Sequence, residues 1–148
     1  MCGIFALQYN ITQQNLDLII AGFKLLENRG PDASSLHIYD KVILGFQRLA
    51  IMDTSSNGNQ PFSLNESKVI CNGEIYNHQY LKDIHELDCK SHSDCECILP
   101  LFHKISFKNL VQVLNGDFAF IIYHDNKFYF ARDRIGVRPL FYGITHDN

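Results

Sequence analysis

The chain has 148 residues, of which 46% are hydrophobic and 20% are charged, and its formal net charge is -3. This composition is typical of a single globular domain with one core. The mild negative charge and the lack of a basic run argue against nucleic acid or an anionic membrane as a partner. No apolar run approaches the ~20 residues of a membrane span, and the first residues lack a basic signal-peptide start. We therefore expect a cytoplasmic protein.

The five cysteines are an odd number without the spacing of a disulfide framework, which also suits a reducing compartment. Cys89, Cys95 and Cys97 lie near His85 and His92, and these residue types could form a metal site. However, the C-x-x-C pairs of structural zinc are missing, and two of the cysteines fall in a predicted helix start. We therefore predict no metal site.

Apolar periodicity predicts the elements of the first half of the chain. A strand is expected over residues 3–8 and a helix over residues 14–28, because apolar side chains recur at helical spacing up to Gly30-Pro31. Further strands are expected over residues 36–39 and 42–46, joined by a turn at Asp40-Lys41, and over residues 68–72.

The stretch SHSDCECILPLFHKI predicts a helix start in the second half. Ser93 and Glu96 have the spacing of a capping box, which puts Asp94 in the first turn. An acidic residue there also interacts favourably with the helix dipole, without any functional role. Pro100 is expected to kink or shorten this helix.

Near the C-terminus, GDFAFIIYHDNKFYFARD contains two aromatic-rich runs on either side of Asp125-Asn126, which predicts a hairpin. Short strands in hairpins with a few helices indicate an α+β fold, in which helices pack on antiparallel sheets.

Cys2 raises the first chemical question, because it directly follows the initiator methionine. A small second residue generally allows Met1 to be removed, which would leave one residue with both a thiol and a free α-amine. The pKa of an α-amine is about 7.7–8.0 and that of a thiol about 8.5, so proton transfer between them is nearly isoenergetic. A penultimate cysteine can equally be incidental.

Two further stretches carry polar groups that could complete a site. NGEIYNHQ lies at the end of a predicted strand, so that Asn72 and Gly73 could supply oxyanion donors, although Asn-Gly is also a common turn signal. Arg48 lies in an otherwise apolar strand and must find a carboxylate or extend to water. A substrate carboxylate would satisfy its guanidinium.

Seven stretches together resemble the class II glutamine amidotransferases, and more narrowly the glutaminase domain of glutamine-hydrolysing asparagine synthetases. In chain order they are MCGIF, RGPD, RLAIMD, NGEIYNH, SDCE, GDFAF and ARDRIGVRPLFYG, which together extend over residues 1–143. The resemblance implies an N-terminal nucleophile hydrolase fold with two stacked antiparallel sheets between helical layers.

The resemblance also implies a mechanism and a set of site residues. Cys2 would attack the side-chain amide of glutamine, with its own α-amine as the proton shuttle, and water would hydrolyse the glutamyl thioester. Asn72 and Gly73 would stabilise the oxyanion. The remaining residues that the resemblance assigns to the substrate are Arg48 for the α-carboxylate, Glu74 and Asp94 for the α-ammonium, and Leu49, Ile51 and Met52 as further contacts.

Other polar residues of these stretches are expected to have structural roles. Asp32, Asp53 and Arg132-Asp133 are predicted to shape loops and form ion pairs. Tyr76 and Asn77 are predicted to order the loop behind the oxyanion donors.

We expect residues 1–148 to form one glutaminase domain that is truncated at its C-terminus, because domains of this family continue through further strands. No glycine-rich phosphate loop is present, so the ATP-dependent synthetase domain is expected to be absent. The glutaminase domain would need no cofactor, whereas ATP and Mg would serve only the synthetase domain or subunit as its partner. The resemblance leaves a homodimer open.

Two alternatives remain at this point. The chain could be a non-catalytic remnant or interaction module of an asparagine synthetase-like protein. It could also be an amidase of the same fold that acts on another substrate.

Overall fold

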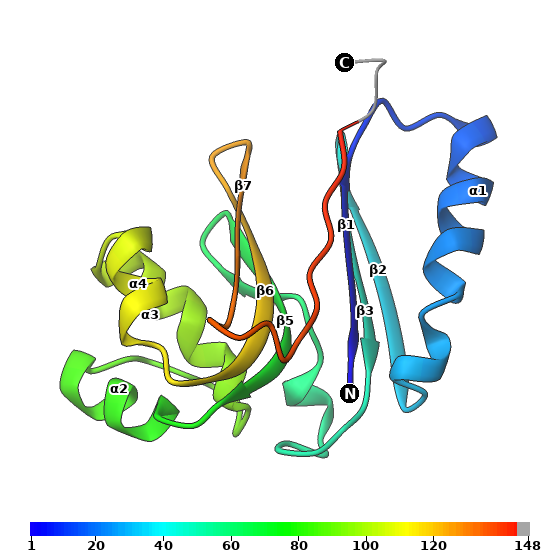
Figure 1. The fold of residues 1–148 in the computed structure, drawn as a ribbon. Helices are drawn as coiled ribbons and strands as arrows, with labels where there is room; N and C mark the ends of the chain where they lie inside the picture. The colour runs from blue at the N-terminus through cyan, green and yellow to red at the C-terminus, as the bar shows by residue number, and fades with distance from the viewer. Residues whose placement is uncertain (145–148) are drawn as a thin grey trace.

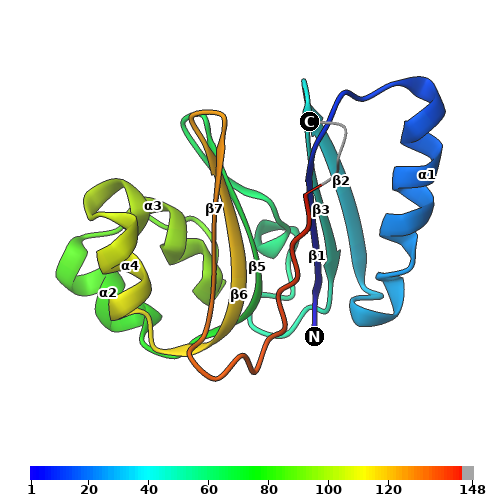
Figure 2. The same ribbon diagram turned by 45° about the horizontal axis from the view of Figure 1, so that its top comes forward.

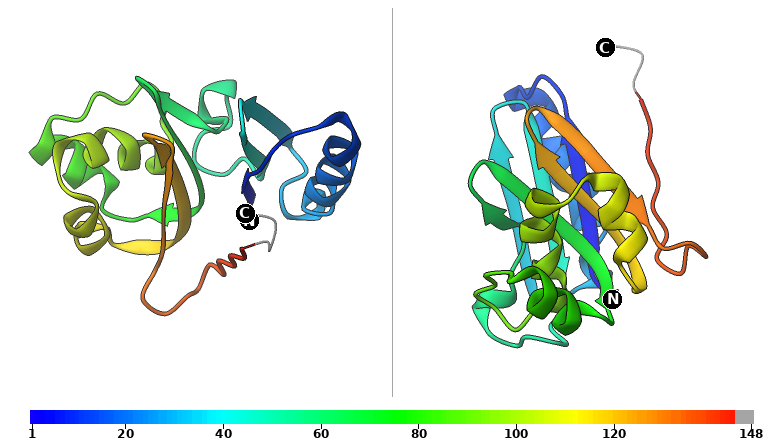
Figure 3. Two further views of the ribbon diagram at one scale, coloured as in Figure 1. Left: turned by 90° about the horizontal axis from the view of Figure 1, so that it is seen from above. Right: turned by 90° about the vertical axis from the view of Figure 1, so that its left-hand side faces the viewer.

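The computed structural model describes residues 1–144, which form four layers in the order helix, sheet, sheet, helices (Figure 1). Helix α1 covers the outer face of a three-stranded sheet, and α2, α3 and α4 cover the outer face of a four-stranded sheet. The views from other directions show the two sheets stacked between these helical layers (Figures 2 and 3). This arrangement confirms the predicted α+β fold with two stacked antiparallel sheets between helical layers.

The first sheet has the order β1-β3-β2 and is antiparallel throughout. Strand β1 (Gly3–Gln8) has the predicted bounds, whereas β2 (Ala33–Tyr39) and β3 (Val42–Arg48) are longer than predicted. All seven residues of the central strand β3 are buried, because one face packs on α1 and the other on the second sheet. The extra length of β3 brings Arg48 to the end of the strand.

Helix α1 (Gln13–Lys24) is shorter than the predicted helix over residues 14–28. Its start is fixed by a capping box between Thr12 and Asn15. Its last turn tightens, since the N–H of Leu25 donates to the carbonyl of Gly22, and a short 3-10 turn at Glu27–Arg29 follows. Leu26, the last apolar residue of the predicted pattern, lies beyond the end of α1 and is half-buried near Gly3, so the apolar spacing continues past the helix itself.

The second sheet has the order β4-β5-β6-β7 and is also antiparallel. Its strands are β4 (Phe62–Leu64), β5 (Ser67–Ile75), β6 (Gly116–His124) and β7 (Lys127–Arg132). The predicted hairpin is confirmed, since Asp125 and Asn126 both have positive φ, at 49° and 55°. The predicted strand over residues 68–72 is too short, because β5 continues to Ile75.

Helices α2 (His78–His85), α3 (Ile98–Lys104) and α4 (Phe107–Val113) pack on the outer face of this second sheet. A 3-10 turn at Asp94–Cys97 precedes α3. Pro100 lies in the first turn of α3, where no backbone N–H is needed, and the α-helix is short because it begins at Ile98 and not near Ser93. None of the helices in residues 1–144 has the length and apolar character that a membrane crossing needs.

The predicted capping box at Ser93 and Glu96 is wrong. The carboxylate of Glu96 accepts hydrogen bonds from the N–H groups of Lys90 and Ser91 at 2.9 and 2.6 Å, and from the Ser91 hydroxyl. Ser93 makes no side-chain cap within the described chain. The Glu96 carboxylate therefore binds the loop that precedes the turn, and not the backbone at the helix start that its spacing from Ser93 predicted.

Candidate active site

A cavity of about 90 Å³ lies where the N-terminus, the end of β3, strand β5 and the turn before α3 meet. All nine residues that the sequence predicts for the site line this cavity: Cys2, Arg48, Leu49, Ile51, Met52, Asn72, Gly73, Glu74 and Asp94. They come from segments up to 92 residues apart, since Asp94 follows Cys2 by that distance in the chain (94 − 2). The pairing of β1 with β3 and the stacking of the two sheets bring them together.

Cys2 is positioned by strand pairing, because Gly3 lies opposite Gln47 in the β1-β3 ladder. This register puts the Cys2 thiol beside the residues that follow β3. Its Sγ lies 3.4 Å from the backbone nitrogen of Leu49, whose N–H donates to it. The same Sγ lies 3.6 Å from the carbonyl oxygen of Leu49. Burial raises the pKa of the Cys2 thiol, and the Leu49 N–H offsets only part of this effect. The thiol is therefore protonated at neutral pH and needs a base to become a nucleophile.

Met1 lies at the same cavity, and its Sδ contacts Nη1 of Arg138. While Met1 is present, the nitrogen of Cys2 is part of a peptide bond and cannot accept a proton. Removal of Met1 would create the α-amine next to the thiol and would also remove a side chain that lines the cavity.

Arg48 ends β3 and is 6% exposed. Its Nη1 donates to the carbonyl of Ser55 and to Oδ1 of Asn59, both at 2.7 Å, and its Nη2 donates to the carbonyl of Asp53. These contacts use three of the five N–H groups of a guanidinium, so two have no partner within residues 1–144. The strand arginine is thus held by backbone and amide oxygens, not by the carboxylate that burial alone would suggest.

The loop after β3 is built closely around this guanidinium. A Cβ atom added at Gly58 would lie 2.3 Å from Nη2 of Arg48, so glycine is required for the observed side-chain position. Asp53 ties the same loop to the segment before α3, since it accepts from the hydroxyl and N–H of Ser55 and from the N–H of His92. These hydrogen bonds, led by the Ser55 hydroxyl, lower the pKa of Asp53 to about 2. The predicted structural role of Asp53 agrees with these contacts.

Strand β5 presents a free edge to the cavity beyond its short pairing with β4. At Cys71, the side-chain amide of Gln60 accepts from the backbone N–H at 2.6 Å and donates to the carbonyl at 3.2 Å. At Ile75, the N–H donates to Oδ2 of Asp94 at 2.6 Å. Gly73 lies between these two positions, and N–H groups alternate in direction along a strand, so its N–H points to the same edge.

The opposite strand supports this assignment. Gly73 is paired with Phe118 of β6, and both the N–H and the carbonyl of Phe118 bond to Asp133 on the far side. The Gly73 N–H therefore has no partner in β6, and within residues 1–144 it has no other partner at the cavity. A Cβ atom at Gly73 would lie 2.3 Å from the carbonyl oxygen of Asp117, so only glycine allows β5 and β6 to approach this closely.

Asn72 is 5% exposed and lines the cavity from within β5. The sequence predicted that Asn72 and Gly73 lie at the end of a strand, with a turn as the alternative. Both lie inside β5, because pairing with β6 continues to Ile75 opposite Gly116. The Asn-Gly turn signal is overridden by this pairing.

Asp94 and Glu74 contribute negative charge to the cavity, in addition to Asp53. Asp94 is 3% exposed, and only its Oδ2 has hydrogen-bond partners within the described chain, which leaves Oδ1 free. Glu74 is exposed. The guanidinium groups of Arg48 and Arg138 and the carboxylates of Asp53, Glu74 and Asp94 thus line a single small cavity.

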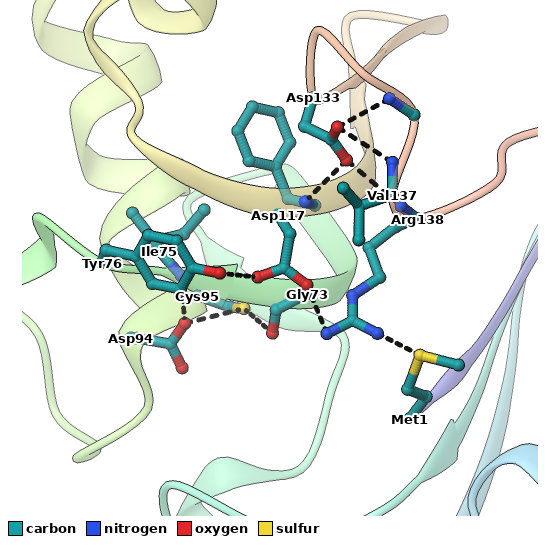
Figure 4. A network of polar contacts seen from close by, with 12 residues as sticks. Met1, Gly73, Ile75, Tyr76, Asp94, Cys95, Asp117, Asp133, Val137 and Arg138 are labelled. Atoms are coloured by element: carbon teal, nitrogen blue, oxygen red, sulfur yellow. Dashed lines mark hydrogen bonds and ion pairs between the residues drawn. The ribbon is translucent and has the colours of Figure 1, made fainter.

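The structure adds Arg138, Asp117 and Cys95 (Figure 4), and also Gln60, to the residues that build or support the cavity. Sequence reasoning assigned none of them to this site and considered Cys95 only as a possible metal ligand. Asp117 accepts from the Tyr76 hydroxyl and pairs with Arg138. The Tyr76 hydrogen bond agrees with its predicted role in ordering this region. The stretch ARDRIGVRPLFYG contains Arg138, but the pattern alone does not indicate which of its arginines turns inward.

Asp133 holds the turn that carries Arg138. Burial opposes its ionisation, but the backbone N–H groups of residues 136–138 and of Phe118 outweigh burial and lower the pKa of Asp133. This is the structural role predicted for it. Among residues 1–144, no group of three histidine, cysteine or acidic side chains is arranged to hold a metal ion.

The glutamine amidotransferase domain family matches the chain over residues 1–148. A probable glutamine-hydrolysing asparagine synthetase of Acanthamoeba polyphaga mimivirus is 45% identical over 98% of the chain, which corresponds to 28% of that protein. Glutamine-hydrolysing asparagine synthetase 3 of Arabidopsis thaliana is 41% identical over 97% of the chain and 26% of its own length.

A relative with lower sequence identity is also named as an asparagine synthetase. A protein of Methanocaldococcus jannaschii with the name "Putative asparagine synthetase [glutamine-hydrolyzing] 2" is 36% identical over 80% of the chain and 27% of its own length. The chain spans about a quarter of the length of these curated relatives, since the matched region is 26–28% of each. The chain belongs to the glutamine amidotransferase domain family.

Proposed function

We propose that the chain hydrolyses glutamine to glutamate and ammonia, with Cys2 as the nucleophile after Met1 has been removed. The observation that carries this proposal is the cavity that Cys2 shares with the unpaired N–H of Gly73, the Asn72 side chain and a buried arginine. A nucleophile, oxyanion donors and charged groups for an amino acid are the parts that amide hydrolysis of glutamine requires.

In the proposed mechanism the α-amine of Cys2 accepts the thiol proton, and the thiolate attacks the side-chain carbonyl carbon of glutamine. The N–H of Gly73 and the side-chain amide of Asn72 stabilise the oxyanion. The amine returns the proton to the leaving nitrogen, so that ammonia departs and a glutamyl thioester remains. Water then attacks the thioester, with the amine again as base, and releases glutamate and the thiol.

The charges of the cavity suit a free amino acid. The two unpartnered N–H groups of Arg48 can bind the α-carboxylate, and Oδ1 of Asp94 together with Glu74 can bind the α-ammonium. Leu49, Ile51 and Met52 contribute the remaining contacts. A site that hydrogen-bonds both ends of the amino acid discriminates strongly against analogues that lack either group.

We further propose that the ammonia is used for asparagine synthesis by an ATP-dependent synthetase domain or subunit. The names of the relatives, which are glutamine-hydrolysing asparagine synthetases, support this proposal. In this proposal the hydrolysis itself uses no cofactor, and ATP and Mg belong to the synthetase reaction.

The test is ammonia release from glutamine, from N-acetylglutamine and from a short peptide that contains internal glutamine. The processed chain should release ammonia from free glutamine only, because the two modified substrates lack a free α-ammonium. Cys2→Ala should release no ammonia, while its circular dichroism spectrum should match that of wild type. It is a matched control because alanine at position 2 also permits removal of Met1. Equal activity on all three substrates would favour an amidase with another substrate, and no activity in the processed protein would favour an interaction module.

A further inference from the structure

The turn before α3 contains a buried thiol that the mechanism does not use. Cys95 is 3% exposed, and its Sγ lies 3.6 Å from the carbonyl oxygen of Gly73 and 3.5 Å from Oδ2 of Asp94 (Figure 4). We propose that Cys95 is a positioning residue, whose thiol holds the Gly73 segment of β5 and Asp94 in register. The inference rests on the proposed function, because these two residues are the proposed oxyanion donor and ammonium ligand.

The free edge of β5 explains why such a residue is needed. From Cys71 to Ile75, no strand within residues 1–144 pairs with this edge, and side chains satisfy its backbone groups instead. Gln60 does so at Cys71, and Asp94 does so at Ile75. At Gly73, between them, the carbonyl has Cys95 as its only hydrogen-bond partner in the described chain. The direction of the Gly73 N–H depends on how firmly this segment is held.

The Cys95 thiol is protonated at neutral pH and can donate a hydrogen bond. A hydrogen bond with Cys71, together with burial, raises the pKa of Cys95 well above its ordinary value. Its single proton is therefore retained, and the Gly73 carbonyl, Oδ2 of Asp94 and the Cys71 sulfur share it as acceptors. A thiol is a weak donor, so its effect comes from a fixed position in a packed environment more than from the strength of the bond.

The Gly73 carbonyl and Oδ2 of Asp94 differ in the other hydrogen bonds that hold them, and this difference predicts how the kinetics of a Cys95 variant would change. Oδ2 of Asp94 keeps the Ile75 N–H at 2.6 Å when the thiol is removed. The Gly73 carbonyl keeps no partner in the described chain. Loss of the thiol should therefore disturb the oxyanion donor more than the ammonium ligand, and kcat should fall more than KM rises.

The experiment compares Cys95→Ala with Cys97→Ala in the processed chain. Cys97 lies on the same turn and is 0% exposed in the same core, but it makes no hydrogen bond to either Gly73 or Asp94. Cys95→Ala should lower kcat on the order of 10-fold, less than the ~10²–10³-fold loss of an oxyanion donor itself, with KM within about 3-fold. Cys97→Ala should lose similar stability in urea but retain kcat, and Cys95→Ser should restore most of the kcat that alanine loses.

A second measurement does not depend on activity. The amide nitrogen of Glu74 shares its peptide group with the Gly73 carbonyl, so its NMR chemical shift reports the hydrogen bond from Cys95. Cys95→Ala should shift this resonance, and Cys97→Ala should not. Equal kcat and equal Glu74 shifts in the two alanine variants would overturn the inference. If the wild-type chain released no ammonia, the proposed function would fail, and the Glu74 shift would still decide whether Cys95 holds this segment.

Discussion

The loop around Arg48 allows a sharp test of the proposed substrate contact, through Gly58→Ala. A Cβ atom at this position would lie 2.3 Å from Nη2 of Arg48, whereas an ordinary contact is 3.4 Å or more. The guanidinium must therefore move by about 1 Å (3.4 − 2.3). Gly58 does not have positive φ, so alanine introduces this clash without backbone strain.

A displacement of about 1 Å can cost about 10²-fold in catalysis, which corresponds to about 2.7 kcal/mol of transition-state binding. Arg48 contacts a part of glutamine that does not react, so most of the loss should appear as a higher KM. The assay is ammonia release against glutamine concentration, with urea unfolding used to verify that the variant is folded at the assay temperature.

Gly22→Ala is the matched control. Gly22 lies in α1, and a Cβ there meets no atom within 4 Å. This variant should retain its kinetics, with stability equal to or above wild type by about 0.5–1 kcal/mol, because alanine favours the helix. If Gly58→Ala folds and has the same KM as Gly22→Ala, the proposed contact between Arg48 and the substrate carboxylate is refuted.

Three further predictions follow from the site and its supports. Asn72→Ala should lower kcat by about 10²–10³-fold in the same assay, and an effect on KM alone would exclude it as an oxyanion donor. Asp94→Asn should raise KM by about 10–100-fold, since a hydrogen bond to a charged group contributes about 1.5–3 kcal/mol; unchanged KM would remove it from the ammonium site. The pKa of Asp53 is about 2 in the folded chain and about 3.9 when unfolded, so its stabilisation is complete above about pH 4 and is lost as pH falls toward 2. Acid unfolding of Asp53→Asn should therefore be shallower than that of Asp17→Asn on the exposed face of α1, and identical curves would contradict this assignment.

The sequence predicted those features that local chemistry determines. Asp125-Asn126 adopts the left-handed backbone of a tight hairpin, as its residue types indicate. Asn72-Gly73 carries a similar signal, but it lies within a strand because eight residues of β5, from Lys68 to Ile75, pair along β6 and outweigh the local preference. Strand β4 has only three residues, and α2 and α4 have eight and seven, so their apolar patterns were too short to be recognised.

In the candidate site, too, some residues could be predicted from the sequence, and others are recognised only from the three-dimensional structure. Motif resemblance identified nine residues that the fold brings to one cavity, although their roles remain predictions. It did not identify Gln60 or Cys95, because their contribution is a hydrogen bond to the backbone of a distant strand. Such contacts depend on which strand edge lies free, and this follows from sheet topology, not from sequence spacing.

Intact-mass measurement after incubation with 6-diazo-5-oxo-norleucine, a glutamine-like electrophile, tests the central claim most directly. The account predicts that the chain has lost Met1 and carries one covalent label, which peptide mapping locates on Cys2. Cys2→Ala should lose Met1 and remain unlabelled, and excess glutamine should slow the labelling of wild type. A chain that has lost Met1, is folded and still resists the reagent would contradict the claim that Cys2 is a glutamine-directed nucleophile.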